Sequence, residues 1–231
     1  MFQKAIAVAK GSIFPIIRTH YKDGKYANIR SVAGTGFFID SEGHFVTALH
    51  VVAGDPSKFK YGHLHNIPYA NFSKISPEEI TPIGSDPSRD LFVGKLTQRL
   101  LPPLNVLKTN PDLGSSILIG GYPFPKINKV KGIFRFNTVR QFWQPTMIMD
   151  YLNMSMLTKY TYNGFLVSHR TIPGMSGGPV IDTDGNVIGL CTASMSRMSG
   201  KDLPHYNGIC LSATELTTGI QRIFRDKEKA I

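Results

Sequence analysis

Short apolar runs separated by glycine, proline and polar residues dominate the hydrophobic pattern of this chain. The runs with the length and composition of strands are SIFPIIRTH, VAGTGFFID, HFVTALHVV, DLFVGKL, SSILIGGY, VKGIFRFNTVRQFW, GFLVSH, GPVID, NVIGLCTA and HYNGICLS. Runs of this kind, bounded by turn residues, predict antiparallel β-strands. The Ser-Glu-Gly sequence at 41–43 and Asp184-Gly185 predict hairpins between the runs that flank them.

Two segments have helical spacing instead. Residues 2–9 predict a short helix, and Leu216, Ile220, Ile223 and Phe224 predict an amphipathic helix at the C-terminus. The stretch 97–113 contains three prolines and little periodicity, which is typical of a linker. We therefore expect an all-β protein of two small barrels or sandwiches, with four parts: residues 1–100, a linker at 101–113, residues 114–212 and a helix at 213–231.

Composition narrows the class of protein. Of 231 residues, 42% are hydrophobic and 18% are charged, which excludes a disordered or collagen-like chain. No apolar run approaches the roughly 18 residues that span a bilayer, so we expect no membrane span. The formal net charge is +10, but the basic residues are scattered along the chain. That scatter indicates a solvated basic surface and disfavours nucleic acid as a partner.

The only two cysteines, Cys191 and Cys210, lie in apolar stretches. Secreted domains of this size usually carry more pairs, so we interpret the two as buried thiols in a reducing compartment. The N-terminal apolar stretch AIAVA is too short for a convincing signal peptide. Both features favour a cytoplasmic protein. A single bridge stays open as an alternative if the two strands are neighbours.

The segment Gly174-Met175-Ser176-Gly177-Gly178 is the strongest candidate for chemistry. Glycines on both sides of a serine let other backbone approach it closely. The amides of Gly174 and Ser176 could then point into one cavity and bind an oxyanion. A glycine-rich turn between strands would have the same sequence, so the segment alone leaves both interpretations open.

A serine hydroxyl is a weak nucleophile and needs a base, which a third group must orient. His50 ends the apolar run HFVTALH, and Asp90 opens the run DLFVGKL. Asp86 competes with Asp90 for the role of the acid, but it lies in the turn-like sequence GSDPS, where we expect it to be more exposed.

Three blocks, TGFFIDSEGHFVTALHVV, SRDLFVGKL and GMSGGPVIDTDGNVIGL, resemble the active-site blocks of trypsin-like serine proteases. They are most similar to the bacterial HtrA (Deg) type of protease domain, here without a PDZ domain. The resemblance implies two six-stranded antiparallel β-barrels and a C-terminal α-helix. It also implies a serine endopeptidase with the catalytic residues His50, Asp90 and Ser176 in a cleft between the barrels. Gly174 and Ser176, together with Met175, would supply the oxyanion amides, and no cofactor or metal is implied.

One departure concerns the residue before the nucleophile. Chymotrypsin-like enzymes have an acid there, which receives a freed N-terminal ammonium group, and HtrA-type enzymes usually have Asn. Met175 occupies this position. The resemblance therefore implies no zymogen switch of the chymotrypsin kind.

The same resemblance assigns a primary specificity pocket. One wall would be Cys191, Thr192, Ala193 and Ser194, and the other would include Arg170 and Thr171. Neither wall carries an acid, which disfavours cleavage after Lys or Arg, whereas Arg170 favours acidic or polar residues. The expected partners are a protein or peptide substrate and an activating or regulatory protein.

Three other interpretations fit parts of the sequence. A catalytically silent, protease-like module could recruit an acidic partner through its net charge. GMSGG also fits the nucleophile elbow of α/β-hydrolases, but the sequence after it reads as strand, turn and strand rather than helix. His63 and His65 could share a strand face as a metal pair, yet without a third ligand nearby in the sequence exposed polar positions are favoured.

Overall fold

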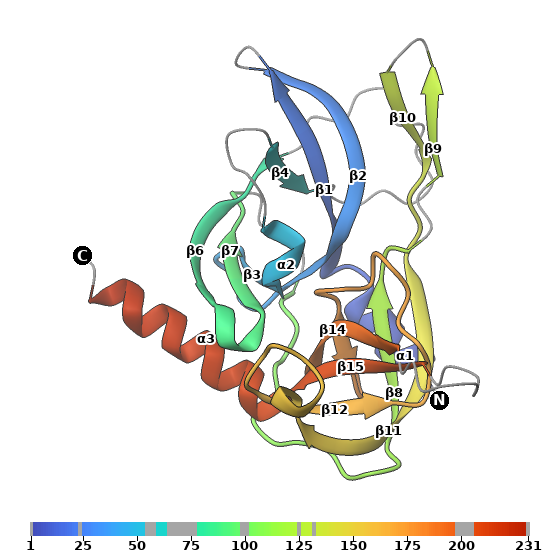
Figure 1. Ribbon diagram of the computed structural model, residues 1–231, viewed down its shortest axis with the longest axis vertical. Coiled ribbons are helices and arrows are strands. Elements are labelled where there is room, and N and C mark those ends of the chain that lie inside the picture. The colour runs from blue at the N-terminus through green and yellow to red at the C-terminus, as the bar shows by residue number, and fades with distance from the viewer. Residues whose placement is uncertain are drawn as a thin grey trace.

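The computed structural model describes residues 2–22, 25–53, 59–63, 78–97, 102–123, 126–130, 133–196 and 206–229, and the structure described below is that of these residues. Figure 1 shows two β-rich halves, one above the other, with a long helix alongside. As predicted, the protein is mostly β.

The first half is one antiparallel sheet with the strand order β5-β4-β1-β2-β3-β7-β6. Its strands are β1 (Ile13–Lys22), β2 (Lys25–Phe38), β3 (His44–Ala48), β4 (Phe59–His63), β5 (Glu78–Glu79), β6 (Thr81–Asp86) and β7 (Leu91–Lys95). The edge strands β5 and β6 are separated along the chain by Ile80 alone, so the sheet must curl until its two edges meet at that residue. The prediction of a closed six-stranded barrel is wrong for this half, because the described strands number seven and form an open sheet.

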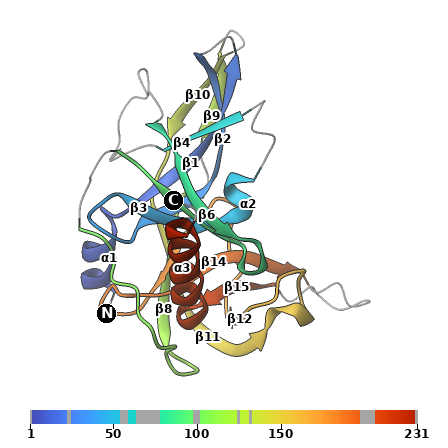
Figure 2. The ribbon, with the colours of Figure 1, turned by 90° about the vertical axis from the view of Figure 1, so that its left-hand side faces the viewer.

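The second half is a closed barrel of six strands in the order β11-β12-β15-β14-β13-β8, which confirms the prediction for this half. These strands are β8 (Ser116–Gly121), β11 (Phe142–Asn153), β12 (Asn163–Val167), β13 (Pro179–Ile181), β14 (Val187–Ser196) and β15 (Tyr206–Ser212). A separate hairpin of β9 (Lys126–Val130) and β10 (Ile133–Thr138) lies beside β2 of the first half (Figures 1 and 2). The domain boundaries expected from the sequence stay a prediction.

Both predicted helices are present, as α1 (Gln3–Ala9) and α3 (Ala213–Glu228). Short turns of helix also occur at α2 (Leu49–Val52), η1 (Pro87–Arg89) and η2 (Met154–Met156). His50 therefore lies in a helical turn directly after a strand, not in the strand itself. Among the described residues, no helix has both the length and the apolar character needed to cross a membrane.

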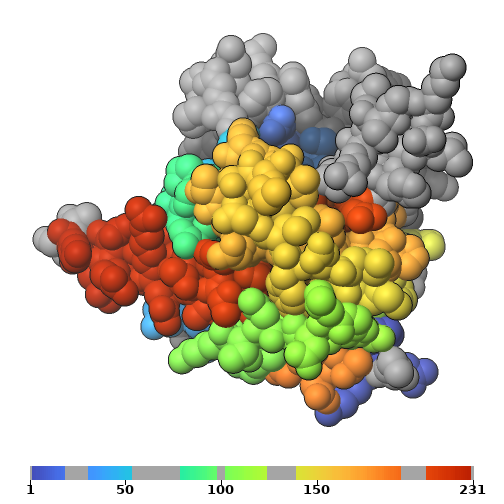
Figure 3. Space-filling model, turned by 60° about the horizontal axis from the view of Figure 1, so that its bottom comes forward, coloured from blue at the N-terminus to red at the C-terminus, as the bar shows by residue number. Residues whose placement is uncertain are grey.

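Helix α3 follows the last barrel strand and packs back over the first half of the chain. Its buried face includes Leu216, Gly219 and Ile223. A Cβ atom on Gly84 of β6 would lie 2.7 Å from Ile223, and one on Gly219 would lie 2.6 Å from Leu91 of β7, so the contact is close on both sides. In Figure 3 the same helix forms a ridge that runs out from the barrel. This helix thus joins the two halves next to the turn between β6 and β7.

The two cysteines are direct partners in the register of β14 and β15. Both are buried and free, as the sequence predicted, and burial raises the pKa of the Cys210 thiol well above its ordinary value. Cys191 packs in the barrel core with Met175, Phe165 and Ile117.

Candidate active site

Two hydrogen bonds join His50 to Asp90, and a third joins the neighbouring Leu49 to the same aspartate. Nδ1 of His50 lies 2.6 Å from Oδ2 of Asp90, and the His50 amide donates to Oδ1 at 3.0 Å. The Leu49 amide donates to the Asp90 carbonyl at 2.7 Å. The Asp90 side chain is only 2% exposed, whereas the imidazole is 42% exposed. Because the carboxylate accepts from Nδ1–H, Nε2 remains as the basic nitrogen on the open side of the ring.

The backbone of Asp90 is unusual. Its φ of 53° is the only positive φ of a non-glycine residue in the described part of the chain. Asp90 caps η1 and turns the chain from β6 into β7. Aspartate tolerates this conformation better than most residues do, but such backbone still costs on the order of 1 kcal/mol and persists only where the surroundings fix it.

Asp86 is not the exposed residue that the sequence predicted, since it is only 4% exposed. Its carboxylate accepts from the amide and hydroxyl of Ser88, at 3.1 and 2.5 Å, and from Arg89 at 2.8 Å. Burial alone would raise the pKa of Asp86, but the bonds from Ser88 and Arg89 outweigh it and lower that pKa. Asp86 is hydrogen-bonded to residues of its own turn, and Asp90 is the acid that contacts His50.

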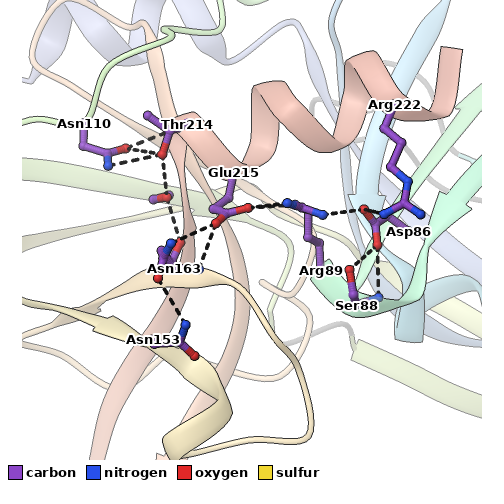
Figure 4. Close-up of polar contacts among 10 residues, drawn as sticks. Asp86, Ser88, Arg89, Asn110, Asn153, Asn163, Thr214, Glu215 and Arg222 are labelled. Atoms are coloured by element: carbon purple, nitrogen blue, oxygen red, sulfur yellow. Dashed lines mark hydrogen bonds and ion pairs between the residues drawn. The ribbon is translucent and has the colours of Figure 1, made fainter. Parts of the chain in front are cut away.

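A partly buried ion cluster fastens this turn to the rest of the molecule (Figure 4). The Arg89 guanidinium contacts Asp86 at 2.8 Å and Glu215 of α3 at 2.7 Å. The other carboxylate oxygen of Glu215 accepts from the amide and side chain of Asn163, which begins β12, at 3.2 and 3.1 Å. One arginine therefore ties η1, α3 and the second barrel together one residue before Asp90.

We expect Arg89→Leu to lower the free energy of unfolding by about 2–3 kcal/mol, because it removes the one charged donor that Asp86 and Glu215 share. Urea unfolding followed by circular dichroism measures this. Arg225→Leu is the matched control, since Arg225 is exposed on the same helix as Glu215. Equal midpoints for the two variants would show that the cluster contributes nothing.

Acid should weaken the fold partly through Asp86. Because its native pKa lies below the ordinary value of 3.8, the native state binds fewer protons than the unfolded state near that pH. The stability that Asp86 contributes is complete above pH 3.8 and is lost as the pH falls through the lowered pKa. Asp86→Asn should therefore be less stable than the wild type at pH 7, and should lose less further stability on acidification. Parallel stability curves, measured by urea unfolding across this range, would contradict the assignment.

The serine loop, residues 172–178, is held by backbone hydrogen bonds at most of its peptide groups. The Met175 amide donates to Ile172 at 2.9 Å, the Gly178 amide to Met175 at 2.9 Å and the Gly177 amide to Cys191 at 2.7 Å. The Met175 amide is therefore engaged and is not free to act as a third oxyanion donor. Among the described residues, the amides of Gly174 and Ser176 donate no hydrogen bond. These two donors remain for a bound group.

Close backbone contacts bring this loop against the segment that carries His50. A Cβ atom on Gly177 would lie 2.0 Å from Oγ1 of Thr47 and 2.8 Å from the Ala48 nitrogen. A Cβ atom on Gly34 would lie 2.6 Å from the Ser176 carbonyl and 2.5 Å from Val51. Only glycine fits at either point. The structure thus places the loop of Ser176 against Thr47 and Ala48, just before His50, and places Gly34 between the Ser176 carbonyl and Val51.

The side chain of Met175 anchors the serine loop in the core of the second barrel. Its side chain is fully buried among the apolar residues of the second barrel, including Ile119 and Val180. Where a charged residue would need a partner, this thioether holds the loop by packing alone.

The predicted pocket walls are also brought together. The Thr171 hydroxyl donates to the Ala193 carbonyl at 2.9 Å. Cys191 and Thr192 are buried. The Thr192 hydroxyl is hydrogen-bonded to the Tyr162 hydroxyl at 2.9 Å and donates to the Ile209 carbonyl at 3.1 Å. Arg170 is exposed, while the side chains of Ser194 and of the predicted metal pair, His63 and His65, lie outside the described part of the structure.

No sequence pattern points to Tyr160 as a neighbour of Asp90. Tyr160 lies near the carboxylate; burial, the charge of Asp90 and hydrogen bonding to it raise the pKa of Tyr160 to about 12. The next residue, Thr161, donates its amide to the Ser88 carbonyl at 2.9 Å. Nothing in the local sequence YTYNG distinguishes these positions, because their partners lie about 70 residues earlier.

The chain is similar in sequence to known proteins over most of its length. A sequence model described as trypsin-like peptidase domain matches residues 34–190. A probable periplasmic serine endoprotease, DegP-like, of Chlamydia pneumoniae is 28% identical over 200 residues, covering 85% of this chain and 35% of that protein. Its counterpart in Chlamydia muridarum is 30% identical over 172 residues, covering 74% of this chain and 30% of that protein. The chain thus spans about a third of the length of these relatives.

Solved structures share the fold. The HtrA-type protease AlgW with tripeptide has a TM-score of 0.70 at 22% identity, covering 97% of this chain and 64% of that one. The active form of the Rv3671c protease from M. tuberculosis has a TM-score of 0.65 at 22% identity, covering 95% and 83%.

Proposed function

Since the chain belongs to the trypsin-like peptidase domain family, we propose that it is a serine endopeptidase that acts through Ser176, His50 and Asp90. One observation carries the proposal: the strand end that leads into the His50–Asp90 pair packs against a glycine-rich serine loop, in which two amides donate no hydrogen bond among the described residues. A purely structural turn would require neither the half-exposed imidazole nor the pair of unused donors.

In the proposed reaction, Oγ of Ser176 attacks the scissile carbonyl carbon while Nε2 of His50 accepts the hydroxyl proton. Asp90 holds Nδ1–H and stabilises the imidazolium that forms. The amides of Gly174 and Ser176 donate to the oxyanion. The imidazolium then protonates the leaving amine, the peptide bond breaks, and water hydrolyses the acyl-enzyme through the same base.

The proposed substrate is a protein or peptide bound in an extended form beside residues 192–194 by β-addition. The exposed Arg170 supports a preference for acidic or polar residues before the cut. A peptide library in which cleavage after Lys or Arg dominates would refute that preference.

Location and regulation are also parts of the proposal. Two buried, unbridged thiols support a reducing compartment such as the cytoplasm, although the Chlamydia relatives are named periplasmic. An activating or regulatory protein would meet the need to control such an enzyme.

Casein and a peptide library, incubated with the wild type and with Ser176→Ala, test the function. We expect new peptide termini with the wild type, and none with the variant. Cleavage by both proteins would remove Ser176 from the mechanism. Cleavage by neither, even after addition of cell extract, would favour the silent binding module.

A further inference from the structure

The side chain of Thr35 crosses from the first half of the molecule into the serine loop. Thr35 lies on β2 and is fully buried. Its hydroxyl donates to the Gly174 carbonyl at 2.7 Å and accepts from the Tyr122 amide at 3.1 Å. Both partners belong to the second half, so one hydroxyl bridges β2, the serine loop and the chain that follows β8.

The backbone of Thr35 contacts the same loop on the other side of Met175. Its amide donates to the Ser176 carbonyl at 2.9 Å. Thr35 therefore binds the carbonyls of Gly174 and Ser176. These are the same two residues whose amides donate no hydrogen bond among the described residues. No other residue in the described part of the chain donates to both.

Gly174 needs such a tertiary partner because its local sterics fix little. Its φ is +100°, it has no side chain, and it follows a proline that lacks an amide proton. The Tyr122 amide also points at the Gly174 carbonyl, but at 3.4 Å, which is too long for a strong bond. The short bond from the hydroxyl is therefore the stronger of the two hydrogen bonds that this carbonyl accepts.

Thr35 is also connected to the strand that leads to His50. The Thr47 hydroxyl donates to the Thr35 carbonyl at 2.7 Å, and Thr47 lies on β3 three residues before His50. Thr35 thus fixes the position of the serine loop relative to the strand that leads to His50. A chain of hydrogen bonds this short and this deeply buried has little freedom to relax.

We propose that Thr35 is a positioning residue for the oxyanion site: its side-chain hydroxyl orients Gly174 so that the amides of Gly174 and Ser176 converge on one point. This role rests on the proposed function. Thr35 contacts no reacting atom, and it acts only through the loop. Loss of one oxyanion donor typically costs 10²- to 10³-fold in rate, so loss of its orientation should cost about 10- to 100-fold.

Thr35→Val, which keeps the shape and removes the hydroxyl, is the first test, and Thr35→Ser, which keeps the hydroxyl, is its partner. On one cleaved peptide we expect Thr35→Val to lower kcat about 10- to 100-fold with KM nearly unchanged, because the amides act on the oxyanion rather than on the ground state. Thr35→Ser should stay within about 3-fold of the wild type. Thr217→Val is the matched control. Thr217 lies on α3, and its hydroxyl donates to the Leu107 carbonyl, so the variant also removes a hydrogen-bonded threonine hydroxyl.

A second readout separates positioning from folding. A fluorophosphonate places its phosphoryl oxygen on the same amides. Its rate of inactivation should fall in parallel with kcat in Thr35→Val. The unfolding midpoint of the variant shows whether it is folded. If that variant does not fold, Thr35→Ala and Thr35→Ser are compared in the same way.

An unchanged kcat in Thr35→Val would overturn the proposal, and so would an equal loss in Thr35→Ser or a change confined to KM. If the wild type cleaves and is labelled, these outcomes concern Thr35 alone. If the wild type neither cleaves nor is labelled, the proposed function and this inference fall together.

Discussion

His50→Ala is expected to lower kcat/KM for peptide hydrolysis by about 10⁴- to 10⁶-fold, the range seen when the base of a serine triad is removed. Without the imidazole, the proposed mechanism loses the group that accepts the Ser176 proton and returns it to the leaving amine. The measurement is initial-rate kinetics on one peptide from the casein digest.

The chain contains a matched control for this substitution. Nδ1 of His44 lies 2.6 Å from Oδ2 of Asp40, the same separation as in the pair of His50 and Asp90. The His44 ring, however, is only 10% exposed and packs against Phe224 of α3, with ring centroids 5.1 Å apart. His44→Ala should therefore reduce stability and leave kcat within a few-fold of the wild type. Equal losses of activity in the two variants would contradict the assignment of His50 as the base.

The second large effect is expected for Asp90→Asn, with a loss of about 10⁴-fold in kcat, because the amide disfavours the productive imidazole tautomer. The carboxylate of Asp90 accepts from both the amide and Nδ1 of His50. An asparagine that offers its NH₂ group to Nδ1 would leave the proton on Nε2, where it blocks base catalysis.

Asp86→Asn makes the same chemical change four residues earlier, in the same turn. Since Asp86 contacts Ser88 and Arg89 rather than His50, we expect lower stability with most of kcat retained. Kinetics at neutral pH on both folded variants separate the two acids. If Asp86→Asn lost as much kcat as Asp90→Asn, position in the turn rather than contact with His50 would matter.

The sequence predicted those features that depend on local pattern. The hairpin at Asp184-Gly185 forms with Gly185 at a φ of 94°, as a tight turn requires. Helix α3 forms where Leu216 and Ile223 recur at helical spacing. The order of His50, Asp90 and Ser176 was visible because three short blocks carry it, and each block folds close to its own strand.

Features that depend on distant partners could not be predicted in this way. The curl of the first sheet follows from the places of β5 and β6 at its two edges, one residue apart along the chain, and no local pattern encodes that arrangement. Asp86 lies in a turn-like sequence, but Arg89 stabilises its buried carboxylate, and Arg89 is held in turn by Glu215, more than a hundred residues away. Thr35 reads as an ordinary strand residue between two glycines, and only the folded chain brings its hydroxyl to Gly174.

The central claim is that Ser176 is a nucleophile activated by His50, and covalent labelling tests it most directly. Native protein is treated with a fluorophosphonate, the intact mass is measured, and the modified residue is located by tandem mass spectrometry. We predict one adduct per chain, on Ser176, with labelling strongly slowed in His50→Ala and unaffected in His44→Ala. The absence of an adduct, an adduct on another residue, or labelling of His50→Ala at the wild-type rate would contradict the account.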